Sequence, residues 1–68
     1  MTRLRIASML LDYRREKGMS QNELGVLLGV SAQAVSKWER EICYPDVILL
    51  PDLAKILGVS VGELFEEL

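Results

Sequence analysis

The sequence predicts an all-α fold, a compact five-helix bundle, and two repeated signals support that prediction. Three glycines end apolar-periodic segments, and each precedes an apolar residue: Gly18, Gly29 and Gly58. Glycine accepts the left-handed conformation that closes a helix, and the next apolar residue can pack back on the last turn. Serine, a preferred N-cap, then stands where the following helix begins: Ser20, Ser31 and Ser60. Ser20–Glu23 and Ser60–Glu63 also match the S-x-x-E capping box, and no segment is typical of a strand.

The helices are predicted at about residues 3–17, 21–28, 32–40, 50–57 and 61–67. Thr2 is a plausible cap for the first helix, in which Ile6, Leu10 and Tyr13 follow helical spacing. Pro51 lacks an amide hydrogen and suits a first helical turn, so a separate turn is expected near residues 47–49. The apolar positions that face away from the charged ones predict the core: Leu10, Leu24, Val35, Trp38, Leu53 and Leu57.

Length and composition exclude several classes of protein. We expect residues 1–68 to form one domain, because 68 residues bury only one small core. The chain has no His and a single cysteine, Cys43, so neither a disulfide within the chain, a zinc site nor a His-based catalytic site is predicted. No metal or cofactor and no enzymatic activity are expected. A lone thiol fits the reducing cytoplasm, with Cys43 as a loop residue, and no apolar run approaches the ~18 residues that span a membrane.

The charges of the chain are distributed unevenly. Residues 1–40 carry seven Lys or Arg and four Asp or Glu, a balance of +3, whereas residues 41–68 carry one against six, a balance of −5. Such asymmetry can mark an end of the molecule that binds a polyanion. An ordinary mixed surface explains it equally well, so charge alone leaves the function open.

The segment from Ser20 to Arg40 is the most informative part of the chain. Two short helices separated by a glycine corner are typical of a helix-turn-helix. In the second helix, Val35 and Trp38 are expected to face the core. The opposite face carries polar side chains at i, i+3, i+4 and i+7: Gln33, Ser36, Lys37 and Arg40. Glutamine can pair with adenine and lysine with guanine or phosphate, so this face is suited to reading duplex DNA.

The sequence resembles the Cro/XRE helix-turn-helix family, which includes phage repressors and many bacterial regulators. The matching stretches are REKGMSQNELGVLLGVSAQAVSKWER, YPD and LLPDLAKILGVSVGELF, and the resemblance extends over about residues 4–66. It implies a bundle of five helices that binds duplex DNA with the third helix in the major groove, usually as a two-fold dimer. The expected function is therefore sequence-specific transcriptional regulation, of repressor type, by a homodimer on a palindromic operator.

The resemblance and the chemistry of the third helix together assign the expected DNA contacts. Gln33 is the foremost candidate for a base contact, followed by Lys37 and Ser36, while Ala32 could touch a thymine methyl group. Phosphate contacts are expected at the helix N-termini, where anions are attracted, and at nearby cations. These residues are Ser20, Gln21, Ser31, Arg15, Lys17 and Arg40. In the family, the glutamine matching Gln21 holds a phosphate or braces a base-reading side chain.

The resemblance also implies a partly buried salt bridge between Arg14 and Glu39, whose role would be to orient the third helix.

Two positions depart from the family pattern. Gly25 stands where the family commonly has Ala, and both residues are small. Glu41 stands where the family often has Gly, so the third helix must end in another way or accept strain.

One alternative function stays open from the sequence. The chain could be a protein-interaction module, such as an antitoxin or co-regulator. Its acidic net charge of −2 supports that alternative, as do apolar residues of the first helix and of the C-terminal end: Met9, Leu11, Leu64, Phe65 and Leu68. Neither function implies a membrane or a small-molecule ligand.

Overall fold

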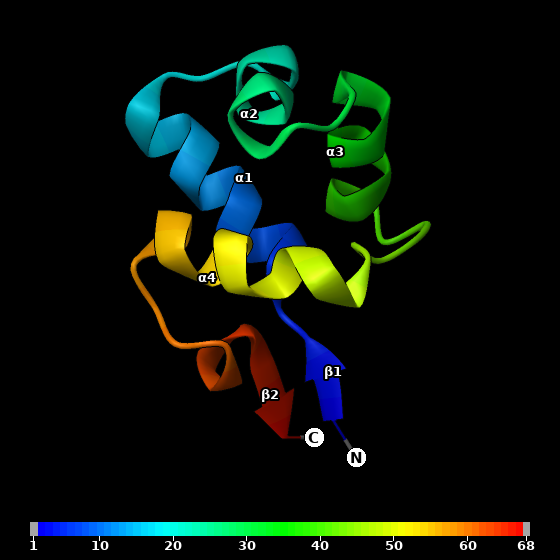
Figure 1. Cartoon of the computed structure of the whole chain (residues 1–68), viewed down its shortest axis with the longest axis vertical. Helices are drawn as coiled ribbons and strands as arrows, with labels where there is room; N and C mark the ends of the chain where they lie inside the picture. Colours follow the sequence, from blue (N-terminus) through cyan, green and yellow to red (C-terminus); the bar gives the residue numbers. More distant parts are fainter. Residues whose placement is uncertain (1, 68) are drawn as a thin grey trace.

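A computed structural model describes residues 2–67 of the chain, and most of them are helical (Figure 1). The four α-helices are α1 (Ile6–Lys17), α2 (Gln21–Leu28), α3 (Ala32–Glu39) and α4 (Leu50–Leu57). A short 3-10 turn, η1 (Val47–Leu49), leads into α4, and another, η2 (Gly62–Leu64), follows α4. Two short strands, β1 (Thr2–Leu4) and β2 (Phe65–Glu67), join the two ends of the chain.

The expected all-α bundle of five helices is therefore wrong at both ends of the chain. Residues 2–4 are extended, so Thr2 is not a helix cap, and α1 begins only after Arg5. The predicted helix at 61–67 is one 3-10 turn followed by a strand, because Phe65 is extended with φ −109° and ψ 151°. The remaining helices start and end within one residue of the prediction, including the separate turn before α4.

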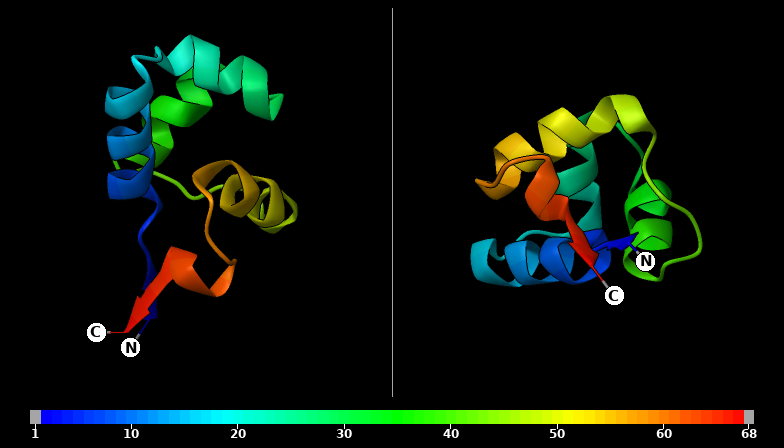
Figure 2. Two further views of the ribbon diagram at one scale, coloured as in Figure 1. Left: turned by 90° about the vertical axis from the view of Figure 1, so that its left-hand side faces the viewer. Right: turned by 90° about the horizontal axis from the view of Figure 1, so that it is seen from below.

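The two strands pair antiparallel, with Arg3 opposite Glu66 and Leu4 opposite Phe65. The amide of Arg5 extends the pairing by donating to the carbonyl of Leu64 at 2.7 Å. A helix over the predicted residues 61–67 would have about two turns, and so short a helix is marginal by itself. Strand pairing instead provides partners for the backbone groups of both ends. The strands lie at the opposite end of the molecule from α2 (Figures 1 and 2).

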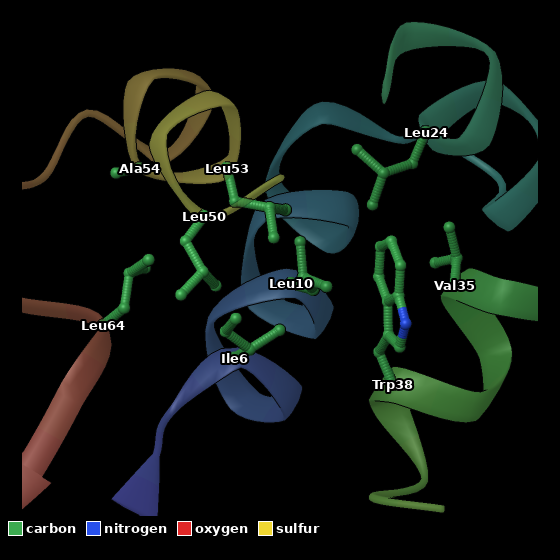
Figure 3. Packing of buried hydrophobic residues seen from close by; sticks show 9 residues of the cluster. All are labelled: Ile6, Leu10, Leu24, Val35, Trp38, Leu50, Leu53, Ala54 and Leu64. Carbon is green, nitrogen blue, oxygen red and sulfur yellow. The ribbon is translucent and has the colours of Figure 1, made fainter. Parts of the chain in front are cut away.

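The core joins all four α-helices to η2 (Figure 3). Its buried members are Ile6, Leu10, Leu24, Val35, Trp38, Leu50, Leu53, Ala54 and Leu64. Five of the six predicted core residues are among them. The sixth, Leu57, is half-buried and packs against this cluster. Figure 3 shows the indole of Trp38 among Leu10, Leu24 and Val35. Trp38 thus ties α3 to α1 and α2.

Among residues 2–67, the end of α3 is the one place outside glycine where the backbone enters the left-handed region. Glu41 has a φ of 58°. Its amide donates to the carbonyl of Trp38 at 3.1 Å, and the amide of Ile42 donates to the carbonyl of Lys37 at 2.9 Å. These two bonds form a Schellman-type helix end, which glycine ordinarily closes. The chain accepts strain at Glu41, one of the two outcomes expected from the sequence.

Candidate nucleic-acid interface

The helix-turn-helix is built by local hydrogen bonds at the ends of α2 and α3. The Ser20 hydroxyl accepts from the Glu23 amide at 3.0 Å, and the Ser20 amide donates to the Glu23 carboxylate at 2.9 Å. The backbone N–H of Ser20, and after it the Ser20 side chain, stabilise the Glu23 carboxylate and lower the pKa of Glu23 below its ordinary value. At the start of α3, the second helix of the helix-turn-helix, the Ser31 hydroxyl accepts a hydrogen bond from the Ala34 amide at 3.1 Å. Both serines are therefore capping residues, and both are exposed at the start of a helix.

The two faces of α3 differ as the sequence predicts. Val35 and Trp38 are buried, at 0% and 5% exposure. Five of the residues expected to contact DNA lie on α3 or at its C-terminal cap. Three of them are exposed, namely Gln33, Lys37 and Arg40, and two are half-buried, namely Ala32 and Ser36. The Arg40 guanidinium folds back along the helix, where its Nε donates to the Ser36 carbonyl at 3.4 Å. The structure thus brings the predicted polar residues of α3 onto one solvent-facing side.

The Glu39 carboxylate, near the C-terminal end of α3, accepts hydrogen bonds from side chains of both α1 and α2. Arg14 donates from Nε to Oε2 at 2.6 Å and from Nη2 to Oε1 at 2.9 Å. The same guanidinium donates from Nη1 to the Met19 carbonyl at 3.1 Å, and Gln21 donates from Nε2 to Oε1 of Glu39 at 3.0 Å. The Glu39 and Arg14 side chains are only 4% and 20% exposed. This cluster fixes the C-terminal end of α3 against the two preceding helices.

Electrostatics of the cluster favour the charged pair. Burial of the Glu39 carboxylate acts to raise its pKa, but hydrogen bonds from Arg14 and Gln21, together with the charges of Arg14 and Arg15, outweigh it and leave the pKa below its ordinary value. For its partner Arg14, the hydrogen bond to Glu39 raises the pKa, while burial acts in the opposite direction.

The contact between Gln21 and Glu39 was not predicted. The resemblance suggested a phosphate contact or a brace for Gln21, whereas in the structure its amide nitrogen binds Glu39. The two residues are 18 positions apart, so no local pattern reveals that they meet. The sequence did predict that Gln21 is the first residue of the second helix, and α2 begins there.

The cations of the chain divide into two sets. Arg3 and Arg5 lie near Glu66, with N–O distances of 3.5 Å and 3.8 Å, in the region of the strand pair. With Arg14 bound to Glu39, three of the seven cations of residues 1–40 are paired in the described part of the chain. The other four are exposed: Arg15, Lys17, Lys37 and Arg40. Lys17 also lies over the Tyr13 ring, 5.9 Å from its centre.

Residues 2–67 show no feature of a metal centre or of a membrane-spanning helix. They contain no group of three or more His, Cys, Asp or Glu side chains that could hold a metal ion. None of their helices is long and apolar enough to cross a membrane. Cys43 is free and exposed in the loop after α3.

Comparison with known proteins agrees with this architecture. The helix-turn-helix family matches residues 10–64. An uncharacterized HTH-type transcriptional regulator of Sinorhizobium fredii, y4dJ, is 44% identical over 59 residues, which cover 87% of this chain and 77% of that protein. The HTH-type transcriptional regulators PuuR of Escherichia coli and SinR of Bacillus subtilis are 33% and 35% identical, but this chain spans only 31% and 57% of their lengths.

Solved structures show the same likeness. The P22 c2 repressor in complex with synthetic operator 9T superposes with a TM-score of 0.76 at 32% identity, over 87% of this chain and 89% of that one. HppE in complex with substrate reaches a TM-score of 0.68 at 32% identity, but the match covers only 34% of the HppE chain. The present chain belongs to the helix-turn-helix family of Cro/XRE type, a family of DNA-binding transcription regulators.

Proposed function

We propose that residues 1–68 form a single DNA-binding domain that represses transcription by placing α3 in the major groove of an operator. One observation supports this most directly: α3 buries Val35 and Trp38 and exposes Gln33, Lys37 and Arg40 on the other side. A helix with small and polar residues on one free face fits the width of the major groove. The P22 c2 repressor, whose structure is similar, was solved in complex with a synthetic operator.

In this proposal the residues of α3 have separate roles. Gln33, the polar residue nearest the N-terminus of α3, contacts base edges, with Lys37 and Ser36 one turn further along. Ala32 contacts a thymine methyl group if one lies opposite. Arg40, at the end of the helix, binds phosphate and carries no sequence information.

The N-terminal ends of α2 and α3 bind phosphate through their backbone. The hydroxyls of Ser20 and Ser31 already accept backbone hydrogen bonds, so free N–H groups beside them are the donors for an anion. Gln21 holds Glu39 with one N–H of its side-chain amide, and its second N–H and its carbonyl oxygen are left to contact phosphate or to brace a base-reading side chain. Exposed Arg15 and Lys17 add positive charge at the end of α1.

We further propose a homodimer on a palindromic operator in the cytoplasm. One α3 contacts only a few base pairs, and two copies about 34 Å apart would read half-sites one helical turn apart. Exposed apolar side chains support self-association. Of the C-terminal apolar residues named from the sequence, Phe65 is exposed at 38%, Leu64 is buried, and Leu68 lies outside the described residues. The most exposed lie after α3 and on α2: Ile42, Tyr44, Val47, Ile48 and Val26.

A contrast between two variants tests the proposal. Gln33→Ala is expected to weaken binding to the preferred duplex by about 1–3 kcal/mol and to relax the preference at one base pair. Arg40→Ala is expected to weaken binding to all sequences alike and to reduce the salt slope by about one unit. If Gln33→Ala loses equal affinity for the preferred and for random duplex, Gln33 does not contact base edges. If neither variant changes DNA binding, α3 is not the recognition helix.

The oligomeric state is tested separately. Sedimentation of the free chain and of its complex with a palindromic duplex is expected to show weak self-association that DNA strengthens. A strict monomer in both samples would refute the homodimer.

A further inference from the structure

Two arginines near the N-terminal end of the chain share one carboxylate. The Arg3 Nε lies 3.5 Å from Oε1 of Glu66, and the Arg5 Nε lies 3.8 Å from Oε2 of Glu66. A charge-assisted hydrogen bond between such groups measures about 2.7–2.9 Å, so both contacts are loose. The side chains of Arg3, Arg5 and Glu66 are 53%, 45% and 36% exposed. Two guanidinium groups against one carboxylate leave a positive charge and N–H donors that face water.

These arginines line the same hollow as the C-terminal end of α3. The hollow has a volume of about 300 Å³. Arg3, Arg5 and Glu66 line it from the region of the strand pair, and Arg40 and Glu41 line it from the end of α3. In Figure 1, β1 lies beyond the C-terminal end of α3. The fold therefore brings three arginines from distant parts of the sequence to one place on the surface.

The charges of this hollow favour an anion. Glu39 also lines it, but its carboxylate is bound by Arg14. The other charged residues of the lining are the three arginines and the two acids named above, a balance of 3 − 2 = +1. The Arg40 Nε donates to the Ser36 carbonyl at 3.4 Å, so the two terminal nitrogens of that guanidinium remain as donors. Guanidinium groups bind phosphate through such parallel N–H groups.

The position of the hollow indicates which anion it meets. With eight residues, α3 is about 12 Å long, and the major groove is about 12 Å wide. Groups at the end of a helix that lies in the groove are therefore close to the phosphates of its wall, where the proposed function already places Arg40. Arg3 and Arg5 line the same hollow and so face the same stretch of DNA backbone.

We propose that Arg3 and Arg5 form a second phosphate-binding site beyond the end of α3, in which Glu66 occupies the place of a DNA phosphate until DNA binds. This inference rests on the proposed function, in which α3 enters the major groove. A phosphate of the DNA backbone replaces the carboxylate as the partner of the two guanidinium groups. Such a contact carries no sequence information, so it adds affinity for every duplex. Glu66 lowers that affinity, because it competes for the arginines and repels the phosphate.

The test removes each charge of this site and compares it with a matched charge elsewhere. Arg3→Gln and Arg5→Gln remove the cations, singly and together. Their control is Lys55→Gln, in the last turn of α4, the end of that helix farther from α3 in Figure 1. Glu66→Gln removes the acid, and its control is Asp12→Asn, which lines a separate hollow between α1 and α4. Each protein is titrated with the preferred duplex and with random duplex at several salt concentrations.

The expected effects follow from counting phosphate contacts. One contact contributes about 0.9 to the slope of log K against log salt, which corresponds to about 8-fold in affinity at about 0.1 M salt. The double arginine variant should lose about one unit of slope and bind both duplexes about 8-fold more weakly, and each single variant about 3-fold. Glu66→Gln should bind both duplexes about 2- to 8-fold more tightly. Both controls should change binding by less than about two-fold.

The opposite signs of these effects separate a binding site from damage to the fold. Loss of structure cannot increase affinity, so Glu66→Gln decides the question if an arginine variant fails to fold. Arginine variants that match Lys55→Gln, or a Glu66→Gln protein that matches Asp12→Asn, would overturn the inference, because net charge alone would then explain the data. If Arg40→Ala weakens binding and the Arg3 and Arg5 variants do not, the proposed function stands and the inference fails. If the unmodified chain binds no duplex at low salt, both fail.

Amide NMR shifts distinguish DNA from a free anion. Addition of duplex should shift the amides of residues 3–8 and of Glu66, whereas inorganic phosphate at the same concentration of phosphate groups should leave them in place. If inorganic phosphate shifts these amides as much as duplex does, the hollow is a site for a small anion and the inference is overturned.

Discussion

Removal of the Arg14 guanidinium is expected to be among the more damaging single changes outside the apolar core. Arg14→Met keeps a side chain of similar length on α1 but leaves the Glu39 carboxylate, only 4% exposed, with Gln21 as its remaining side-chain partner. Isolating one member of a fully buried pair costs about 3–5 kcal/mol. Arg14 is 20% exposed, so water can reach the site, and we expect a loss of about 2–4 kcal/mol.

That loss is large relative to the whole stability of the chain. At about 0.05–0.15 kcal/mol per residue, a domain of 68 residues has a free energy of unfolding of about 3–10 kcal/mol. Replacing both partners by apolar residues, in Arg14→Met with Glu39→Leu, removes the buried charge together with its counter-ion. Such double replacements are often neutral or stabilising. The double variant should therefore unfold within about 1 kcal/mol of the unmodified protein.

Urea titrations followed by the fluorescence of Trp38, the single tryptophan, measure all four proteins of this cycle. The expected coupling energy between the two positions is about 2–3 kcal/mol, typical of residues in one network. If the two single losses add up to the loss of the double variant, the pair does not act as a unit, and the reasoning is refuted.

The same cycle predicts a pH dependence. The pKa of Glu39 is lowered in the folded state from an ordinary value of 4.5, so the unfolded chain takes up its proton first as the pH falls. The stability that Glu39 contributes is therefore present above about pH 4.5 and is lost as the pH falls through the lower, folded-state pKa. Glu39→Leu should show a shallower loss of stability with acid than the unmodified protein. An equal slope in both would contradict the pKa assignment.

Three further predictions concern the core, the end of α3 and the strand pair. Trp38→Ala should cost about 3–5 kcal/mol, and a melting temperature within a few degrees of the unmodified protein would contradict the core assignment. Glu41→Gly removes a side chain from a residue with φ 58°. This change should stabilise the fold by about 1 kcal/mol and raise the melting temperature by about 4–8 °C. No rise in the melting temperature would mean that Glu41 is not strained. Glu66→Gln should change the free energy of unfolding by less than about 1 kcal/mol, because its pairs with Arg3 and Arg5 are exposed. A larger loss in urea titration would show that these ion pairs, rather than backbone bonds, hold the strands.

The middle of the chain was predictable because its signals are local. Glycine after α2, serine before α3 and Pro51 at the start of α4 each determine a helix boundary within a few residues of themselves. The strand pair joins Thr2 to Glu67 across nearly the whole chain, and no short pattern records such a partner. The capping box of Ser60 and Glu63 does form, yet it starts only a 3-10 turn. The local signal was correct, and the distant pairing decided what followed it.

The candidate site was predictable to a similar extent and for the same reason. Helical spacing separates Gln33 and Lys37 from Val35 and Trp38, so the two faces of α3 follow from the sequence. The approach of Gln21 to Glu39 and of Gly25 to Val30 depends on how three helices meet. The alternative of a protein-interaction module loses part of its sequence support, since Leu64 is buried in the core and Met9 packs against it.

The arrangement of charges explains how an acidic chain can bind a polyanion. The balance of +3 in residues 1–40 overstates the charge available to DNA, because Arg3, Arg5 and Arg14 are paired with acids of the same molecule. The balance of −5 in residues 41–68 likewise overstates the repulsion, since part of it lies beside the strand pair, at the opposite end of the molecule from α2 (Figure 1). Beyond the Debye length of about 8 Å at physiological salt, such distant charges are largely screened. In the proposed complex, the charge that DNA meets at the α2–α3 face is therefore set by the exposed cations and helix N-termini close to that face, and the net charge of −2 is a poor guide to binding.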